Sequence, residues 1–385
     1  MYNFDTLPVR LNTNSVKWDI KIDSKRDILP MWVADMDFLA PDFIINSLKK
    51  RVDMGVFGYS DVPNKFYKAI INFFDRRHNL KLKKDEIIFS TGVVPIISSL
   101  VNKLTTPAEN VVILSPVYNI FYNSIRNAGR KILESNLVLN DGKYEIDFKD
   151  LEEKLKNPET TLMIFCNPHN PVGKIWSKEE LSKVSKLAKK YDVKIISDEI
   201  HCDIVTPGKE YIPFLNIDSD VIACVSASKC FNLAGLQGAA VLVKNRYLYN
   251  RCYRSLNTDE IAEGNAFVFD TFTEAFNKGD NWLKELNEYI YQNKLYVYDY
   301  IEKNIKNISC IKGDATYLVW LDIRKITNDS DKFVDFLVKE TGLLLSSGSI
   351  YGSSGNGFLR INLATSLANV KDGLKRLEEG VKLYE

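Results

Sequence analysis

A lysine that follows an apolar run is the first residue whose position suggests chemistry. Lys229 lies in the segment SASKCFNLAGLQG (226–238), two small residues after the run VIACVS (221–226). Small neighbours allow a bulky planar ligand to approach, and a lysine amine at such a place is a candidate for forming a Schiff base with a carbonyl group. A surface lysine that ends a strand is the alternative, and this segment alone does not decide between the two.

An acidic residue at a similar place is the second candidate. Asp198 stands directly after the run VKIIS (193–197), in the segment SDEIHCDI (197–204). A carboxylate at the end of a buried strand requires a cation or hydrogen-bond donors, and a pyridinium nitrogen would be such a cation. Of its neighbours, Glu199 fits a solvated or helix-capping acid, and His201 fits a histidine whose hydrogen bonds are satisfied.

The segment CNPHNPVG (166–173) is the most specific of these motifs. Its two Asn-Pro steps hold the backbone in an extended, non-helical conformation, so Asn170 presents its amide from a rigid position. A plain turn is the alternative, but a turn does not require two Asn-Pro steps followed by glycine.

Two further segments carry groups suited to anions. In STGVV (90–94) an apolar run passes into a helix-like segment, and free backbone N–H groups at a helix N-terminus suit a phosphate. In GFLRINLA (357–364), Arg360 lies inside an apolar run, where an arginine pairs with an acid or binds a carboxylate through two hydrogen bonds. Each motif is weak by itself, and a structural role remains open for both.

The elements that must position these motifs are short apolar strands separated by helix-like segments. The expected strands are residues 86–90, 110–115, 161–166, 193–197, 221–226 and, less clearly, 239–243. Ser177 and Glu180 have the spacing of a capping box and begin an amphipathic helix that runs to Tyr191. Such a pattern predicts an α/β fold with a mainly parallel sheet, in which ligands bind beyond the carboxyl ends of the strands. Four of the motifs directly follow expected strands, so we expect one shared site.

The last hundred residues differ from the middle of the chain. A long helix is expected over 280–306, strand-like runs lie in 309–323 and 343–363, and a closing helix is expected over 366–383. The Gly- and Ser-rich stretch 346–357 has the composition of a mobile loop. We therefore expect a smaller α+β domain at residues 281–385, a large ligand-binding domain at 46–280, and an N-terminal segment, 1–45, that packs on the small domain.

The composition excludes several classes of protein. The 385 residues carry 51 basic and 50 acidic side chains, and this balance provides no field for a nucleic acid or an anionic membrane. Six cysteines form no CxxC pair and no zinc-like spacing with histidine, so reduced thiols and no metal site are expected. No signal peptide and no run of about 18 apolar residues is visible, and we expect a cytoplasmic protein.

The ordered set STG, SPVY, NPHNPVG, SDEIH, SASK and FLRIN resembles the fold-type I pyridoxal 5′-phosphate (PLP) enzymes of the class I/II aminotransferase superfamily. Within it, SVKWD (15–19), LPMWVADMDF (29–38) and FGYSDVP (57–63) look like the MalY/PatB branch of cystathionine β-lyases. The resemblance implies the aspartate aminotransferase-like fold, PLP as cofactor, and a homodimer with shared active sites. This branch commonly has a Pro-Gly before the arginine, whereas this chain has SSGSIYGSSG.

The same resemblance implies roles for single residues. Lys229 would form the Schiff base, Asp198 would pair with the pyridine nitrogen, and Tyr118 would stack on the ring. Asn170 and His201 would serve the phenolic oxygen of the cofactor. The phosphate would be held by Gly92, Val93 and Ser226, and by Tyr59 of the neighbouring subunit. Arg360 would bind the substrate α-carboxylate, and Asp35 would also contribute to substrate binding.

The resemblance favours one reaction over two others. A carbon–sulfur β-lyase would cleave L-cystathionine or related cysteine S-conjugates to a thiol, pyruvate and ammonia. A broad-specificity aminotransferase would use the same binding residues and require a 2-oxo acid acceptor. A third hypothesis, a PLP-binding regulator without catalysis, is less favoured because no basic stripe for DNA is visible.

Overall fold

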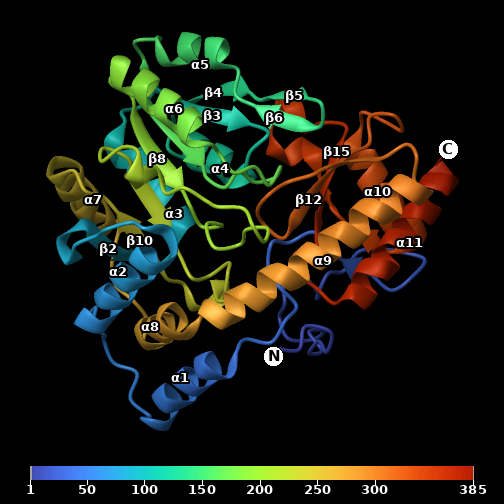
Figure 1. The fold of residues 1–385 in the computed structure, drawn as a ribbon, viewed down its shortest axis with the longest axis horizontal. Helices are drawn as coiled ribbons and strands as arrows, with labels where there is room; N and C mark the ends of the chain where they lie inside the picture. Colours follow the sequence, from blue (N-terminus) through green and yellow to red (C-terminus); the bar gives the residue numbers. More distant parts are fainter. Residues whose placement is uncertain (1, 385) are drawn as a thin grey trace.

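The computed structural model describes residues 2–384 and places a seven-stranded sheet at the centre of the larger part of the molecule (Figure 1). In spatial order its strands are β2 (Ile87–Ser90), β10 (Ala239–Leu242), β9 (Ile222–Val225), β8 (Lys194–Asp198), β7 (Thr160–Cys166), β3 (Asn110–Ser115) and β4 (Lys131–Asn136). Six of the seven strands run in the same direction, and β10 runs antiparallel to its neighbours β9 and β2. The predicted α/β class with a mainly parallel sheet is confirmed.

Helices cover both faces of this sheet, because alternate strand residues point to opposite faces and almost all of them are apolar. One face packs against α3 (Val93–Leu104), α4 (Asn119–Asn127) and α7 (Arg246–Thr258). The other face packs against α2 (Asn64–His78), α5 (Phe148–Leu155), α6 (Lys178–Lys190) and α8 (Val268–Lys278). The capping box predicted at Ser177 and Glu180 begins α6.

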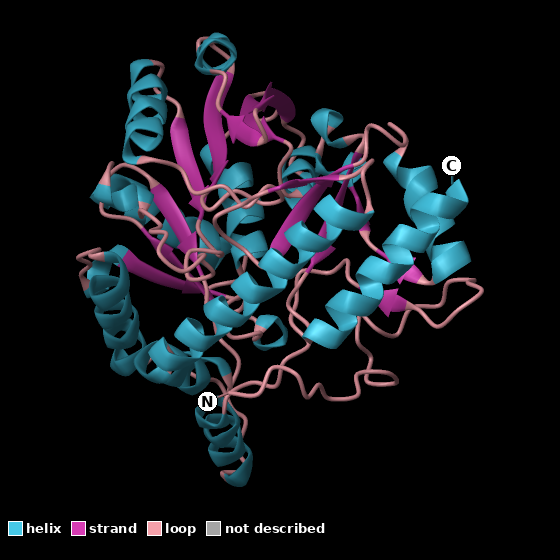
Figure 2. Ribbon diagram, turned by 45° about the vertical axis from the view of Figure 1, so that its right-hand side comes forward, coloured by secondary structure: helices cyan, strands magenta, loops and turns pink. Residues whose placement is uncertain are grey.

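A second, smaller sheet lies in the C-terminal part of the chain (Figure 2). Its antiparallel strands are, in order, β11 (Ser309–Ile311), β12 (Leu318–Asp322), β15 (Phe358–Asn362) and β14 (Ser346–Ser347). The helices of this part are α9 (Asp280–Asn304), α10 (Ser330–Thr341) and α11 (Leu367–Tyr384). Apolar residues of all three pack with the sheet in a core of their own. The long helix α9 runs from beside α8 to this core (Figure 1).

The N-terminal segment joins the small sheet region without forming a domain of its own. Strand β1 (Leu29–Pro30) pairs in parallel with β13 (Leu343–Leu344). The following helix α1 (Asp42–Asp53) projects from the body in both ribbon views (Figures 1 and 2). A short hairpin, β5 (Val138–Asn140) and β6 (Lys143–Glu145), completes the strands of the described residues.

The Gly- and Ser-rich stretch 346–357 is anchored, although its composition is that of a mobile loop. It forms two 3-10 turns, Gly348–Tyr351 and Ser353–Gly355, and Tyr351 is buried. Glu134 accepts hydrogen bonds from Ser353 and from Tyr122 of the large sheet region. Long-range contacts of this kind are not visible in local composition.

No helix within residues 2–384 is long and apolar enough to cross a membrane.

Candidate active site

A cavity of about 300 Å³ lies where the strands β7, β8 and β9 end. The register brings these ends together, because Cys166 of β7 pairs with Asp198 of β8, which pairs with Cys224 of β9. The side chains and backbone that line the cavity include Ala34, Gly92, Tyr118, Asn170, Asp198 and Lys229. Segments that are far apart in the sequence therefore meet at the carboxyl edge of the sheet, as the order of the motifs predicts.

Lys229 reaches the cavity from the turn after β9. Its Nζ donates a hydrogen bond to the backbone carbonyl oxygen of Ala34, at 2.7 Å. Burial, followed by the nearby Arg360 guanidinium, lowers the pKa of the Lys229 amine from 10.5 to about 8. About a tenth of the amine is therefore neutral at pH 7, far more than for an ordinary lysine, and only the neutral amine acts as a nucleophile or a base.

Asp198 is the last residue of β8, and its carboxyl group is buried in the cavity wall. Burial raises the pKa of this group to about 6, although the backbone N–H of Ile200 donates to Oδ1 at 3.1 Å and Lys229 lies near. Within residues 2–384, no lysine, arginine or histidine nitrogen lies within 4.0 Å of this carboxylate. The cavity therefore offers a buried anion to a cationic ligand.

His201 and Asn170 lie on the same wall. Nδ1 of His201 is buried and has no hydrogen-bond partner among the described residues, and burial keeps the pKa of the imidazole well below 6.5. Oδ1 of Asn170 accepts a hydrogen bond from Nη1 of Arg360, at 3.2 Å. His201 is thus a neutral group with one free ring nitrogen, contrary to a histidine whose hydrogen bonds are all satisfied.

Arg360 comes from β15 of the small sheet and is almost completely buried. Its Nη2 donates to the carbonyl oxygen of Trp32 at 2.8 Å, and its guanidinium lies 5.0 Å from the ring centroid of Tyr351. Its Nε has no partner among the described residues, and no described carboxylate lies within ion-pairing distance. The structural alternative, pairing with an acid, is not observed, so Arg360 is a buried cation available to an anionic ligand.

Tyr118 and the start of α3 form the remaining walls. Burial raises the pKa of the Tyr118 phenol to about 12, so this hydroxyl is protonated at neutral pH and is not a base. Gly92 and Val93 line the cavity at the N-terminus of α3, where backbone N–H groups are unpaired. A Cβ atom on Gly92 would lie 3.2 Å from Cδ of Pro95, so this approach is already close.

Four residues to which the sequence assigns roles lie outside the cavity lining, and one of them, Arg360, contacts it through the hydrogen bond to Asn170. The Ser226 hydroxyl donates to the Gly238 carbonyl at 2.6 Å, and the neighbouring Ser228 lines the cavity instead. The Asp35 carboxylate is ion-paired with Arg10 at 2.7 Å. Tyr59 is fully exposed at the surface. The binding roles of Ser226, Asp35 and Tyr59 stay predictions.

Two residues that line the cavity, Ala34 and Gln237, are not among the site residues predicted from the sequence. Ala34 contributes a backbone carbonyl, which every residue possesses and no sequence pattern marks. Gln237 lines the cavity with a left-handed backbone, φ 52°, which is uncommon for a residue other than glycine. Its place between two glycines of the segment 226–238 was the available signal.

The sequence of this chain matches a known family and named relatives. The model of the family described as aminotransferase class I and II matches residues 27–377. The chain belongs to this family. It is 39% identical to cystathionine beta-lyase PatB of Bacillus subtilis (strain 168), over 98% of this chain and 99% of that one. It is 29% identical to protein MalY of Escherichia coli (strain K12), over 99% of each chain.

A solved crystal structure has the same fold as this chain. The crystal structure of cystalysin from Treponema denticola, which contains a pyridoxal 5′-phosphate cofactor, matches with a TM-score of 0.96. It is 33% identical, and all of both chains is covered. The expected aspartate aminotransferase-like fold is confirmed, together with the resemblance to cystathionine β-lyases.

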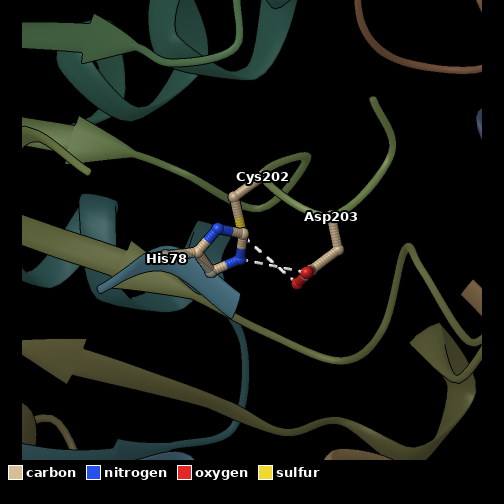
Figure 3. Close-up of side chains that lie close together, drawn as sticks. All are labelled: His78, Cys202 and Asp203. Carbon is tan, nitrogen blue, oxygen red and sulfur yellow. Dashed lines mark hydrogen bonds and ion pairs between the residues drawn. The ribbon is translucent and has the colours of Figure 1, made fainter. Parts of the chain in front are cut away.

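Outside the lining of this cavity, the side chains of His78, Cys202 and Asp203 lie close together (Figure 3). Oδ1 of Asp203 accepts from Nε of Arg77 at 2.7 Å and lies 3.0 Å from Nε2 of His78. The Cys202 thiol donates to Oδ2 at 3.4 Å. These donor types could bind a metal, but the carboxylate is already paired: against the opposing effect of burial, the His78 imidazole and then the Arg77 guanidinium hold the pKa of Asp203 well below its ordinary range. We interpret the cluster as the anchor of the loop after β8 to the end of α2.

Proposed function

We propose that the chain is a PLP-dependent carbon–sulfur β-lyase, which cleaves L-cystathionine or related cysteine S-conjugates to a thiol, pyruvate and ammonia. One observation carries this proposal: a lysine amine and an unpaired buried carboxylate line one cavity, and a buried arginine without an acidic partner donates a hydrogen bond to Asn170 in its wall. They do so in a chain that is 39% identical to a cystathionine beta-lyase over nearly its whole length.

The residues at the cavity fit PLP group by group. Asp198 offers an unpaired buried carboxylate to the pyridine nitrogen, and His201 offers an unpartnered Nδ1 beside Asn170 to the phenolic oxygen. The N-terminus of α3, at Gly92 and Val93, offers backbone N–H groups to the phosphate. Lys229 offers an amine to the aldehyde, and Tyr118 offers an aromatic wall. When bound, PLP withdraws electrons from the substrate Cα, so that the Cα–H bond becomes acidic and a group on Cβ can leave.

The chain's own groups would orient the substrate and move its protons. The Arg360 guanidinium would bind the α-carboxylate, and this contact fixes the direction of the Cα–H bond. The neutral Lys229 amine, whose pKa is about 8, would take the proton from Cα. Asp198 would keep a proton on the ring nitrogen opposite its carboxylate. Departure of the substrate sulfur from Cβ would then complete the elimination.

We also propose a homodimer in the cytoplasm, with no nucleic-acid or membrane partner. Tyr59 supports shared active sites, because it is fully exposed in the single chain and follows the exposed side chains of Met54 and Phe57. The proposed divisions are an N-terminal segment (1–45), a large PLP-binding domain (46–280) and a small domain (281–385). The separate core that the end of α9 forms with α10, α11 and the small sheet supports the small domain, whereas the larger core also includes Phe38 of the N-terminal segment and Trp320 of the small sheet. Residues 1 and 385 lie outside the described residues.

A broad-specificity aminotransferase is the second candidate, and the description of the matching family favours it. The two reactions are separated by one assay. The PLP-loaded protein is mixed with L-cystathionine in the absence of any 2-oxo acid, and free thiol and pyruvate are measured together.

The lyase predicts equal amounts of thiol and pyruvate without an acceptor. Turnover that strictly requires a 2-oxo acid would make the protein an aminotransferase. Tight PLP binding without turnover of any amino acid would favour the third hypothesis, a PLP-binding regulator without catalysis.

A further inference from the structure

Two side chains of different elements share one backbone oxygen at the edge of the cavity. The Lys229 amine donates to the Ala34 carbonyl at 2.7 Å, and the hydroxyl of Tyr317 donates to the same oxygen at 2.8 Å. Tyr317 is completely buried and its ring lies edge-on to that of His201, with 6.1 Å between the centroids. No motif in the sequence marks Tyr317.

The Ala34 carbonyl is held by its flanking peptides. The side-chain amide of Asn362 donates to the carbonyl oxygens of Val33 at 2.5 Å and of Asp35 at 2.7 Å. Asn232, three residues after Lys229, accepts from the backbone N–H of Met36 at 3.0 Å. The Ala34 carbonyl oxygen therefore has a fixed position relative to Lys229, and it stays in place when the amine moves.

The backbone before Tyr317 is in an uncommon conformation. Thr316 has a φ of 64°, which a β-branched residue rarely adopts. Its N–H donates to the Ile204 carbonyl at 2.7 Å, in the loop that follows Asp198 and His201. Such backbone strain persists only where the surrounding structure imposes it. Here the strained Thr316 directly precedes Tyr317, so it fixes the position from which the Tyr317 hydroxyl reaches the Ala34 carbonyl.

We propose that Tyr317 is a positioning residue for the Lys229 amine, acting through the Ala34 carbonyl oxygen that both side chains use. The inference rests on the proposed function, in which this amine takes the Cα proton. A carbonyl oxygen has two lone pairs, and a second donor reduces its ability to hold the protons of the first. The shared acceptor therefore directs one N–H of the amine away from the substrate without binding the charged form strongly.

The charged groups around the amine come from three elements. Arg360 of β15 opposes its positive charge, whereas Asp35 of the N-terminal segment and Asp198 of β8 favour it. His201, in the loop after β8, is itself affected by the lysine charge and stays neutral through burial. A change confined to the Tyr317 hydroxyl leaves all these groups in place, so its effect on the amine can be separated from theirs.

The test compares Tyr317→Phe with Tyr144→Phe. Tyr144 is also buried and accepts a hydrogen bond from Trp320 of β12, but it lies outside the cavity lining. We expect Tyr317→Phe to lower kcat roughly 2- to 10-fold, the range of one hydrogen bond, with little change in KM. We expect the acid limb of its kcat profile to move to higher pH by about half a unit or more, because the Ala34 oxygen then holds the ammonium form more strongly.

A second readout does not depend on activity. In the cofactor-free protein, the rate at which an acylating reagent modifies Lys229 is followed against pH by peptide mass spectrometry. The midpoint is expected to move upward in Tyr317→Phe, and to stay unchanged in Tyr144→Phe. This arm remains informative if the wild-type protein proves to have neither lyase nor aminotransferase activity.

A further variant separates the shared acceptor from a loosened backbone. Asn362→Ala releases the peptides on both sides of Ala34 but leaves the Tyr317 hydroxyl, so it is expected to lower kcat without moving the labelling midpoint. An unmoved midpoint in Tyr317→Phe overturns the proposal. An equal movement in Asn362→Ala also overturns it, since the effect would then come from backbone position.

Discussion

Burial shifts the two central ionisable groups of the cavity toward their neutral forms. It raises the pKa of Asp198 to about 6 and lowers the pKa of Lys229 to about 8. Both shifts have the same cause, because a low-dielectric site disfavours charge of either sign. A ligand that brings a cation to Asp198 and an aldehyde to Lys229 would relieve both costs at once.

The replacement Lys229→Ala is expected to abolish the absorption band of the cofactor–lysine linkage. Turnover should fall by about 10²-fold or more, because both the attachment point and the base are lost. Absorption spectra and thiol release measure these effects. Lys209→Ala, which removes an exposed lysine, serves as the control and should be unaffected. An active variant with the wild-type spectrum would disprove the assignment of Lys229.

The replacement Asp198→Asn is expected to stabilise the cofactor-free protein at pH 7.5. The folded pKa of about 6 lies above the ordinary value of 3.8, so the folded wild type holds its proton more tightly than the unfolded chain does. Wild-type stability therefore falls as pH rises from about 4 to 6, by up to about 3 kcal/mol.

Urea denaturation of both cofactor-free proteins between pH 4 and 7.5 measures this difference. The stabilisation by asparagine should be greatest at pH 7.5 and should vanish near pH 4, where the aspartic acid is already neutral in the fold. A difference that is constant with pH would show that the carboxyl group is not destabilised by burial. With PLP present, the order should reverse, because the cofactor would pair with the carboxylate.

At the scale of elements, the end of β8 and the loop after it contribute residues to the cavity, and an ion pair anchors the same loop to α2. Asp198 and His201 line the cavity, whereas Asp203, a few residues later, is buried against Arg77 and His78 at the end of α2. Adjacent stretches of one loop therefore face a ligand site and a structural ion pair. Because α2 packs on the face of the large sheet opposite α3, the ion pair ties the loop to the sheet's own core.

The replacement Asp203→Asn is expected to lower the free energy of unfolding by roughly 3 kcal/mol, since it leaves the Arg77 cation partly buried without its partner. Asp280→Asn is the matched control: Asp280 contacts the same arginine at 3.5 Å but is exposed, so the cost should stay below about 1 kcal/mol. Chemical denaturation at pH 7 compares the two.

The pH dependence gives a second check on this ion pair. The pKa of Asp203 is lowered in the fold, so its stabilisation is present above the ordinary value near 4 and is lost as the pH falls further. The gap between wild type and Asp203→Asn should therefore close in acid. Equal costs for the two replacements at pH 7 would contradict a structural role for the buried pair.

At the scale of the whole molecule, the segment from Leu29 to Asp37 connects the parts of the protein. Leu29 of this segment pairs with β13. The carbonyl oxygen of Trp32 accepts a hydrogen bond from Arg360, and that of Ala34 accepts one from Lys229. The far end of the segment is fixed by Asp37, which is buried in an ion pair with Lys17 at 2.9 Å. The proposed base and the proposed carboxylate-binding residue are thus positioned against one stretch of backbone.

Subunit mixing tests whether a second copy completes the site. Lys229→Ala and Tyr59→Ala proteins are each expected to be nearly inactive at limiting PLP. After mixing and reassociation, about a quarter of the wild-type activity should return, because half of the dimers are hybrids and each hybrid has one intact site. Activity that stays absent in a mixture shown to contain hybrids would contradict a role for Tyr59 in the neighbouring site.

The sequence by itself determined six of the seven strands of the large sheet, the α/β class and the motifs that gather at one edge of the sheet, whereas the edge strand β4 was not predicted. These follow from local patterns, since apolar runs of strand length and Asn-Pro steps restrict the chain wherever they occur. The positions of Asp198, Asn170 and Lys229 after successive strands were enough to expect that they meet. The antiparallel direction of β10 was not predicted, because a short apolar run does not record which way it crosses the sheet.

Only the tertiary structure decided which groups complete the cavity. The Ala34 carbonyl meets Lys229 from 195 residues away, and a backbone carbonyl has no residue type that a sequence could display. Arg360 lacks an acidic partner, and the Asp198 carboxylate lacks a cation, because of where the two sheets place them. Unpaired charge and shifted pKa values are properties of an environment, so they exist only after distant segments have packed together.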